Sequence, residues 1–305
     1  MNLIALLIGL VIERLATQWF HWRRMRWLDR IIDRGFAFAA RVPGWPALIP
    51  IVLLAVLLVL PACAVIVALG GTLAGFTYLL LAIVLLFFSL GPHDIGEEVD
   101  EYCTALESEN HDDILRASKA IIEGDLPEEP LAIIRRVEES VCVQANNRLF
   151  AVIFWFVVLG PLGPLAAWAY RVTDLIRRRA VFNAARSEPD DQNAMRVRDA
   201  AVTLHGWLAW IPARLTAVGY ATAGHFDEAI AAMRTPAEQG ASTSEQNENL
   251  LARVGVAALA LHEDDAESIT ARGVRGAAAA KRLVFRQLMI WVVIISAMTL
   301  YGLTQ

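Results

Sequence analysis

The sequence predicts an all-α fold: a polytopic helical membrane protein built as a single domain over residues 1–305. Hydrophobic residues make up 56% of the chain, and its mean hydropathy of +0.47 lies well above that of ordinary soluble proteins. No stretch alternates apolar and polar residues between turn signals, so we expect no sheet. Together these features predict about four full spans, re-entrant or broken helices, and a cytoplasmic helical module.

Four apolar stretches approach or exceed the roughly 20 residues that a helix needs to cross a bilayer. The first is followed by arginines rather than by a small-residue cleavage site, so we expect it to remain as a membrane helix. It contains Glu13 and Arg14, and ionisable residues inside a span usually pair and have a function; a position near the membrane surface is the alternative. The predicted spans are residues 1–20, 45–69, 72–90 and 283–303.

A fifth apolar stretch, residues 149–170, is interrupted at its centre by Gly160-Pro161-Leu162-Gly163-Pro164. Proline removes a backbone donor and disfavours helix in the residue before it. Interrupted backbone at membrane depth persists only where protein or a cavity surrounds it. We therefore predict that two short helices meet here in a re-entrant turn; a single kinked span is the alternative.

Arginine-rich segments predict the orientation, because Lys and Arg mark the cytoplasmic side of a membrane. Residues 21–46, predicted as a loop, hold six arginines, and residues 171–200 hold seven. A full crossing at residues 149–170 would place these segments on opposite sides, whereas a re-entrant turn keeps both inside. We expect the re-entrant scheme, with both termini periplasmic; the alternative has a second full crossing around residues 204–223.

The parts expected in the cytoplasm, residues 92–148 and 171–282, show apolar residues at helical spacing. We predict one helix after a cap at Asp94 and a second that ends at Gly124. The other predicted helices are 130–147, 197–224 and 250–261, and the predicted polar loops are 187–192 and 235–249.

Carboxylates, amides and arginines gather just before and just after the interrupted stretch. If the chain turns back, these two ends meet at the cytoplasmic face. Arginines there would bind a phosphate or pyrophosphate, and carboxylates would hold Mg²⁺. The alternative is a ring of polar residues that only ends two helices. The predicted ligand-binding residues are Glu139, Ser140, Asn147, Arg148, Tyr170, Arg171 and Asp174.

Two further residues join this predicted set, His205 and Arg214, which flank the segment Trp207–Pro212. The alternative is an interfacial helix with an aromatic anchor. No catalytic residue is assigned, and the six histidines lack the spacing of a metal site. The absence of a GxxxxGK[ST] motif excludes a P-loop, and three unrelated cysteines predict reduced thiols.

Several motifs resemble one known superfamily. The run FWFVVLGPLGPLAAWAYR at residues 154–171, followed by TDL and by WIPARLTA at residues 210–217, is similar to the superfamily that joins the CobD/CbiB cobalamin-biosynthesis proteins with AmpE. IGLVIERL at residues 8–15 and LGPHDIGEEVDEY at residues 90–102 resemble AmpE specifically. The resemblance covers nearly the whole chain in the same order.

The cobalamin branch is an ATP-dependent amide ligase, and a diverged enzyme of that type is the alternative that the resemblance implies. Glu139 and Ser140 match its pattern before the hairpin. Several of its carboxylates, which would hold Mg²⁺ or exchange protons, are replaced here, as they are in AmpE. The differing residues are Val143, Gln144 and Asn147 before the hairpin, and His205 and Gly206 before the WIPAR motif.

The resemblance to AmpE implies an inner-membrane protein of Gram-negative bacteria, linked to β-lactamase induction and cell-wall-fragment signalling. It also implies a sensory role, with a nucleotide as a candidate ligand and Mg-ATP as a candidate cofactor. We expect the lipid bilayer and a phosphorylated or cell-wall-derived small ligand as partners, and no nucleic acid. The interrupted helix suggests a transporter as a third hypothesis. Whether the protein is an enzyme stays open.

Overall fold

The computed structural model describes residues 25–41, 46–69, 76–90, 94–188, 191–236, 240–262 and 266–301. Every regular element in these ranges is a helix, which confirms the predicted all-α fold for the described part of the chain. The predicted span at residues 1–20, with Glu13 and Arg14, lies outside the described residues.

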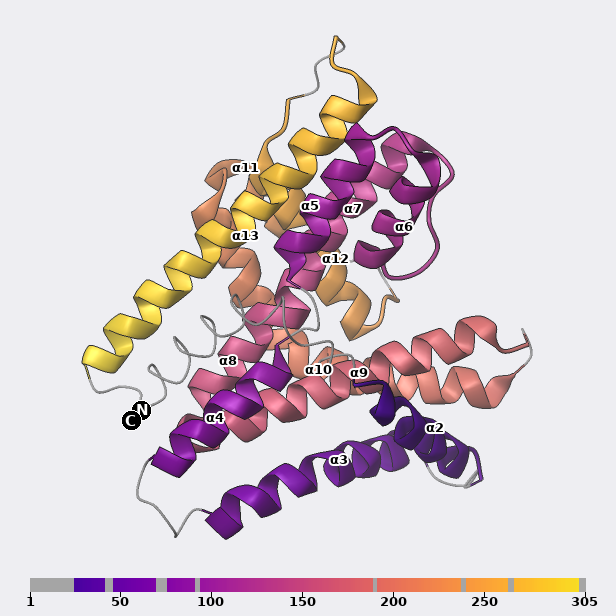
Figure 1. Cartoon of the computed structure of the whole chain (residues 1–305), viewed down its shortest axis with the longest axis vertical. Helices are drawn as coiled ribbons and strands as arrows, with labels where there is room; N and C mark the ends of the chain where they lie inside the picture. Colours follow the sequence, from indigo (N-terminus) through magenta and orange to yellow (C-terminus); the bar gives the residue numbers. More distant parts are fainter. Residues whose placement is uncertain are drawn as a thin grey trace.

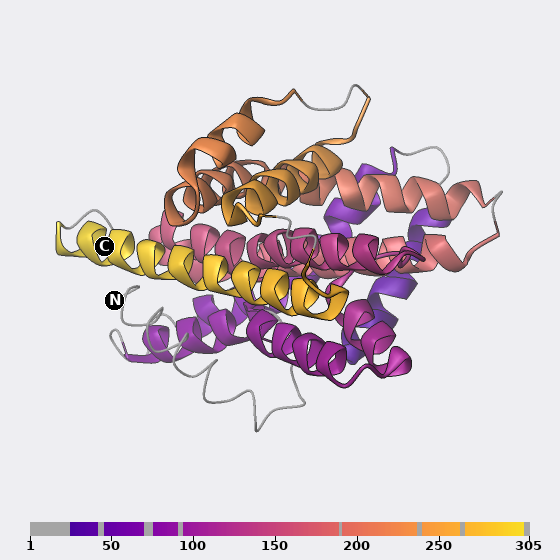
Figure 2. The same ribbon diagram turned by 90° about the horizontal axis from the view of Figure 1, so that it is seen from above.

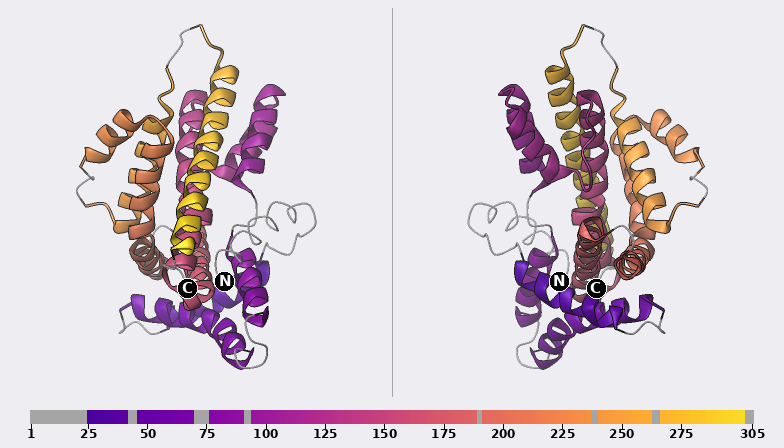
Figure 3. Two further views of the ribbon diagram at one scale, coloured as in Figure 1. Left: turned by 90° about the vertical axis from the view of Figure 1, so that its left-hand side faces the viewer. Right: turned by 90° about the vertical axis from the view of Figure 1, so that its right-hand side faces the viewer.

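One part of the molecule is a helical module in three layers (Figures 2 and 3). The middle layer consists of α7 (Pro130–Ala145) and the long helix α13 (Ile269–Leu300). On one side lie α5 (Ile95–Glu107) and α6 (His111–Ile121). On the other side lie α11 (Phe226–Arg234) and α12 (Thr243–Leu259). The layers bury a shared core that includes Val99, Tyr102, Val137, Val141, Tyr220, Leu251, Val254 and Leu283.

Helix α7 continues through one π-helical turn, η2 (Asn146–Phe150), into α8 (Ala151–Val158). A 3₁₀ turn, η3 (Gly160–Leu162), then reverses the chain into α9 (Gly163–Arg186), which packs along α8 (Figure 1). The reversal requires glycine at position 163, because a Cβ there would lie 1.9 Å from the carbonyl oxygen of Phe156. The chain thus turns back at the interruption, but the arms are parts of two long helices rather than two short ones.

Helix α10 (Gln192–Ala223) runs beside α9 and contains Pro212. The remaining helices are α2 (Arg26–Ala40), α3 (Leu48–Leu69) and α4 (Phe76–Ser89). Both α3 and α4 pack on α9, and α2 lies against the N-terminal end of α3 (Figure 1).

Three described helical stretches are long and apolar enough to cross a membrane: residues 48–68, 130–158 and 269–299. The first and third contain most of the predicted spans at 45–69 and 283–303. The described part of the predicted span at 72–90 is a shorter apolar helix, α4, of 14 residues. These helices support a membrane location.

Two predictions about loops were wrong. Residues 26–40, expected within a loop, form α2, because Leu28, Ile32 and Phe36 recur on one face and bury themselves against α3. The loop predicted at residues 235–249 ends earlier, because α12 begins at Thr243. Ser242 and Glu245 form a capping box there, in which each side chain bonds the backbone N–H of the other residue.

Candidate functional site

The reversal between α8 and α9 brings together polar residues that precede and follow it. The Tyr170 hydroxyl donates to Oδ1 of Asn147 across the hairpin at 3.5 Å. The ring of Tyr170 also lies beside the His205 ring of α10, with centroids 5.3 Å apart. All three residues are buried, so the base of the hairpin is a polar site enclosed by protein.

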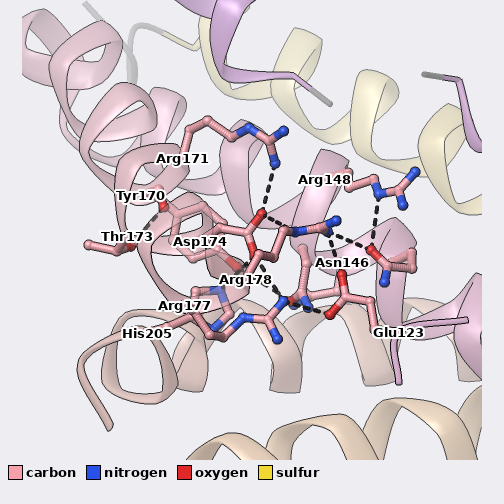
Figure 4. Close-up of polar contacts among 12 residues, drawn as sticks. Glu123, Asn146, Arg148, Tyr170, Arg171, Thr173, Asp174, Arg177, Arg178 and His205 are labelled. Carbon is pink, nitrogen blue, oxygen red and sulfur yellow. Dashed lines mark hydrogen bonds and ion pairs between the residues drawn. The ribbon is translucent and has the colours of Figure 1, made fainter. Parts of the chain in front are cut away.

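Asp174 lies at the centre of this site and is fully buried (Figure 4). Its carboxylate accepts hydrogen bonds from Arg171 at 2.8 Å, Arg177 at 3.0 Å and Arg178 at 2.9 Å. These four residues share one face of α9, because their spacing matches the helical repeat. A buried carboxylate with three charged donors is strongly held in its ionised form.

A second set of contacts links this centre to the helical module. Arg177 and Arg178 both bond Glu123, which follows α6, at 3.0 and 2.9 Å. Arg178 also donates to Oε1 of Gln144 on α7 at 2.7 Å. The same Gln144 oxygen accepts from Arg148 at 3.0 Å.

Arg148 completes this network on the side of α5. Its guanidinium bonds both carboxylate oxygens of Glu98, at 2.7 and 2.9 Å, and both residues are buried. Glu248 of α12 lies 3.7 Å from Arg177. Within the described part of the chain, the network therefore sets four arginines (148, 171, 177 and 178) against four carboxylates (Glu98, Glu123, Asp174 and Glu248).

The charges in the network shift the acidity of its members. Burial alone would raise the pKa of Asp174, but the arginines around it outweigh this and hold its pKa well below the usual range. Arg177 and Arg178 likewise lower the pKa of Glu123, whose side chain is partly exposed at the cleft. Burial, with Arg177 nearby, lowers the pKa of His205 to about 3, so its imidazole is neutral near pH 7.

Several buried polar atoms around Asp174 have no hydrogen-bond partner among the described residues. They are Nε of Arg171, Nε of Arg177, Nδ2 of Asn147 and both ring nitrogens of His205. The first three are donors only, and a neutral imidazole adds one donor and one acceptor. Unpaired buried polar groups cost about 1–3 kcal/mol each, so this excess of donors favours a hydrogen-bond acceptor at the site.

A cleft of about 580 Å³ opens beside the network, between α7 and α12. Gln144, Glu123 and Glu248 belong to both the cleft wall and the network. A volume of this size accommodates a small organic ligand. The remaining polar side chains of the wall are Arg136, Glu139, Ser140, Gln246, Asn249 and Arg253.

The nine residues predicted from the sequence fall into three places. Asn147, Arg148, Tyr170, Arg171, Asp174 and His205 form or adjoin the buried network. Glu139 and Ser140 line the cleft, where Glu139 is paired with Arg136 at 3.2 Å. Arg214 belongs to neither: it stacks on Trp210 and donates to Oδ1 of Asn247 at 3.0 Å.

The sequence analysis missed five members of the site: Glu98, Glu123, Glu248, Arg177 and Arg178. Glu98 and Glu123 lie 50 or more residues from their arginine partners, so no local pattern reports these contacts. Arg177 and Arg178 carried a usable signal, since they follow Asp174 at the spacing of one helix turn.

The unpartnered donors fit an anionic group such as a phosphate better than they fit a cation such as Mg²⁺. Asp174 and Glu123 are each bonded to arginines. In the described ranges, no group of three or more His, Cys, Asp or Glu side chains is placed to hold a metal ion.

Comparison with known proteins gives two matches. The cobalamin biosynthesis protein CobD of Stutzerimonas stutzeri (strain A1501) is 32% identical over 161 residues, which cover 52% of this chain and 49% of that protein. The aligned part thus spans about half the length of this relative. No solved structure matched the chain. The family described as regulatory signalling modulator protein AmpE matches residues 1–304, so the chain belongs to the AmpE family.

Proposed function

We propose that this protein is an inner-membrane regulator of β-lactamase induction that responds to a phosphorylated or cell-wall-derived small ligand. Membership of the AmpE family supports the regulatory role. The observation that supports ligand binding is the set of buried donors without partners around Asp174, next to an open cleft. An anionic group offers the acceptors that these donors lack.

The ligand enters through the cleft between α7 and α12 and reaches the network at Gln144, Glu123 and Glu248. An anion there competes with carboxylates for the guanidiniums of Arg177 and Arg178. These arginines connect α9 to the helical module, so such competition changes the packing of the module against the α8–α9 hairpin. This exchange of ion-pair partners is the proposed signal.

The orientation is part of the proposal: residues 171–200 lie on the cytoplasmic side together with residues 21–46. The support is one contact between these arginine-rich segments. Arg179 of α9 forms a two-point ion pair with Asp33 of α2, at 2.8 and 2.5 Å. Two segments in direct contact lie on the same side of a membrane, and arginine-rich segments favour the cytoplasm.

The test is a thermal-shift titration of the purified protein in detergent with inorganic phosphate, ATP and ADP. A ligand that binds only the folded state raises the unfolding midpoint with concentration. We expect a saturable shift for at least one of these anions that weakens about tenfold or more in Arg171→Gln. Arg214→Gln is the matched control, because it removes the same group outside the network.

The same pair of variants is then compared for β-lactamase induction in cells. We expect Arg171→Gln to impair induction and Arg214→Gln to preserve it, at equal protein levels. Arg171→Lys, which keeps the charge, separates a folding defect from a ligand defect. Normal induction in folded Arg171→Gln would contradict the proposal.

A second candidate function is a diverged ATP-dependent ligase or transferase. The similarity to the CobD protein of Stutzerimonas stutzeri favours it. The measurement that tests it is ADP formation from ATP by the purified protein with Mg²⁺. Binding of ATP without turnover would leave the regulatory function as the better account.

A further inference from the structure

Helix α2 presents a stripe of exposed basic and aromatic side chains on the face opposite its core contacts. The stripe consists of Trp27, Arg30, Arg34, Phe38 and Arg41, of which Arg41 caps the helix. Their spacing of three, four, four and three residues follows the helical repeat, so all five lie in one narrow sector.

The stripe is positively charged throughout, because it holds three arginines and no acidic residue. The side chains of Arg30, Arg34 and Arg41 are exposed and form no ion pair or hydrogen bond with the described part of the chain. The neighbouring acid Asp33 lies beside the stripe and is already bound to Arg179 and Asn183. The three guanidiniums are therefore available to a partner.

Two large aromatic side chains share the stripe with the arginines, and both are open to solvent. Trp27 is 62% exposed and Phe38 is 59% exposed. Aromatic rings between basic residues are typical of helices that lie in the membrane interface, where rings enter the headgroup layer and cations meet lipid phosphates.

The position of α2 fits this surface. It lies against the N-terminal end of α3, the most apolar candidate span, through Leu28, Ile32 and Phe36 (Figure 1). The span at residues 48–68 begins only seven residues after Arg41. The stripe therefore lies close to where the chain enters the bilayer.

We propose that the α2 stripe binds the anionic phospholipid headgroups of the leaflet that α3 enters. The arginines bind lipid phosphates, and Trp27 and Phe38 insert beside them at headgroup depth. Each basic residue near an anionic surface contributes about 1 kcal/mol, which is about fivefold in affinity. The proposal is independent of the ligand site around Asp174.

The first test measures binding of phosphatidylglycerol and phosphatidylcholine to the purified full chain in detergent by native mass spectrometry. We expect a preference for phosphatidylglycerol that falls about 25-fold in Arg30→Gln/Arg34→Gln. The matched control is Arg116→Gln/Arg234→Gln, which removes two exposed arginines from α6 and α11 and should keep the preference. An equal effect of the two double variants would overturn the proposal.

The second test locates α2 relative to the bilayer without changing the stripe. A fluorophore is attached at Ala37→Cys in a chain whose native cysteines are serine, and the protein is placed in phosphatidylglycerol nanodiscs. We expect headgroup nitroxide lipids to quench it strongly, and to leave a label at Asp227→Cys on α11 unquenched. Equal quenching of the two labels would contradict the placement, whatever the first test gives.

Discussion

Two of the three described stretches that are long and apolar enough to cross a membrane differ sharply in how much of their surface the protein buries. The most apolar 18-residue window within residues 48–68 has a mean hydropathy of 3.2, and only 17% of that window is buried in the protein. The most apolar 18-residue window within residues 130–158 has a mean hydropathy of 1.5, and 72% of that window is buried. The first leaves most of its side chains on the protein surface, whereas the second packs against other helices and carries Arg148 in a buried ion pair.

The difference shows that hydrophobicity alone does not identify what a helix contacts. A helix that is apolar all round is buried either by lipid or by protein. In residues 130–158 the surrounding helices bury most of the surface, which permits the charged Arg148 in η2 because it pairs with Glu98. The predictions below test this contrast, from the largest expected effect to the smallest.

Removal of the central carboxylate should have the largest effect. Asp174→Asn keeps the size of the side chain but removes the charge that the buried Arg171 and Arg177 and the partly exposed Arg178 share. Breaking a buried ion pair from one side costs about 3–5 kcal/mol of unfolding free energy. Denaturant or thermal unfolding in detergent measures it. Asp100→Asn, which breaks the exposed pair with Lys281, should cost about 1 kcal/mol or less.

A charge on the outward face of α3 should impair membrane insertion. Val56 is 49% exposed and lies within the span at residues 48–68. Arginine at the centre of a span costs about 2.5–3.5 kcal/mol on insertion scales, so we expect Val56→Arg to accumulate poorly in the membrane fraction. Leu131→Arg, at an exposed position that begins residues 130–158, should accumulate normally. Equal accumulation of the two variants in the membrane fraction would contradict the proposed difference between residues 48–68 and residues 130–158.

Closing the hairpin should depend on Gly163. Gly163→Ala forces a Cβ against the carbonyl oxygen of Phe156, and overpacking of this kind costs about 1–3 kcal/mol. Leu162→Ala changes the adjacent residue, which is 59% exposed, and should change stability by about 0.5 kcal/mol or less. Unfolding midpoints of the two variants measure the difference, and a stable Gly163→Ala would argue against the tight turn.

Acid should destabilise the protein through His205. Its pKa falls from about 6.5 in the unfolded chain to about 3 in the folded state, so only the unfolded chain takes up the proton between these values. Stability is therefore complete above pH 6.5 and decreases as the pH falls. Between pH 7.5 and 5.5 the expected loss is about 1.4 kcal/mol. His205→Gln should show a smaller loss, and an identical pH profile would exclude this role.

The sequence was sufficient for the elements whose signals are local. Gly160 to Pro164 predicted the reversal, and Asp94 predicted the start of α5, where its side chain accepts from the N–H of Gly96 at 2.8 Å. The sequence was insufficient where contacts between distant segments determine the partner of a side chain or the form of a helix. The partners of Arg148 and Arg177 come from α5 and from the residues after α6, and the insertion of η2 into a continuous helix has no pattern of its own.

Arg171 and Arg214 illustrate the same limit within the candidate site. Both are arginines near prolines in apolar surroundings, and the sequence analysis placed them in one binding site. In the structure, Arg171 faces Asp174 inside the hairpin, whereas Arg214 turns outward to Trp210 and Asn247. The two arginines differ in the side of the helix on which they lie and in the residues that pack there.

The central claim is that the chain turns back at Gly160 to Gly163 without crossing the membrane, so that α2 and the end of α9 share one side. Cysteine labelling tests this most directly. Ala40→Cys and Ala185→Cys, each in a cysteine-free background, would be exposed to a membrane-impermeant maleimide in intact spheroplasts and after permeabilisation. We predict that both react only after permeabilisation. Labelling of Ala185→Cys in intact spheroplasts, with Ala40→Cys protected, would contradict the account.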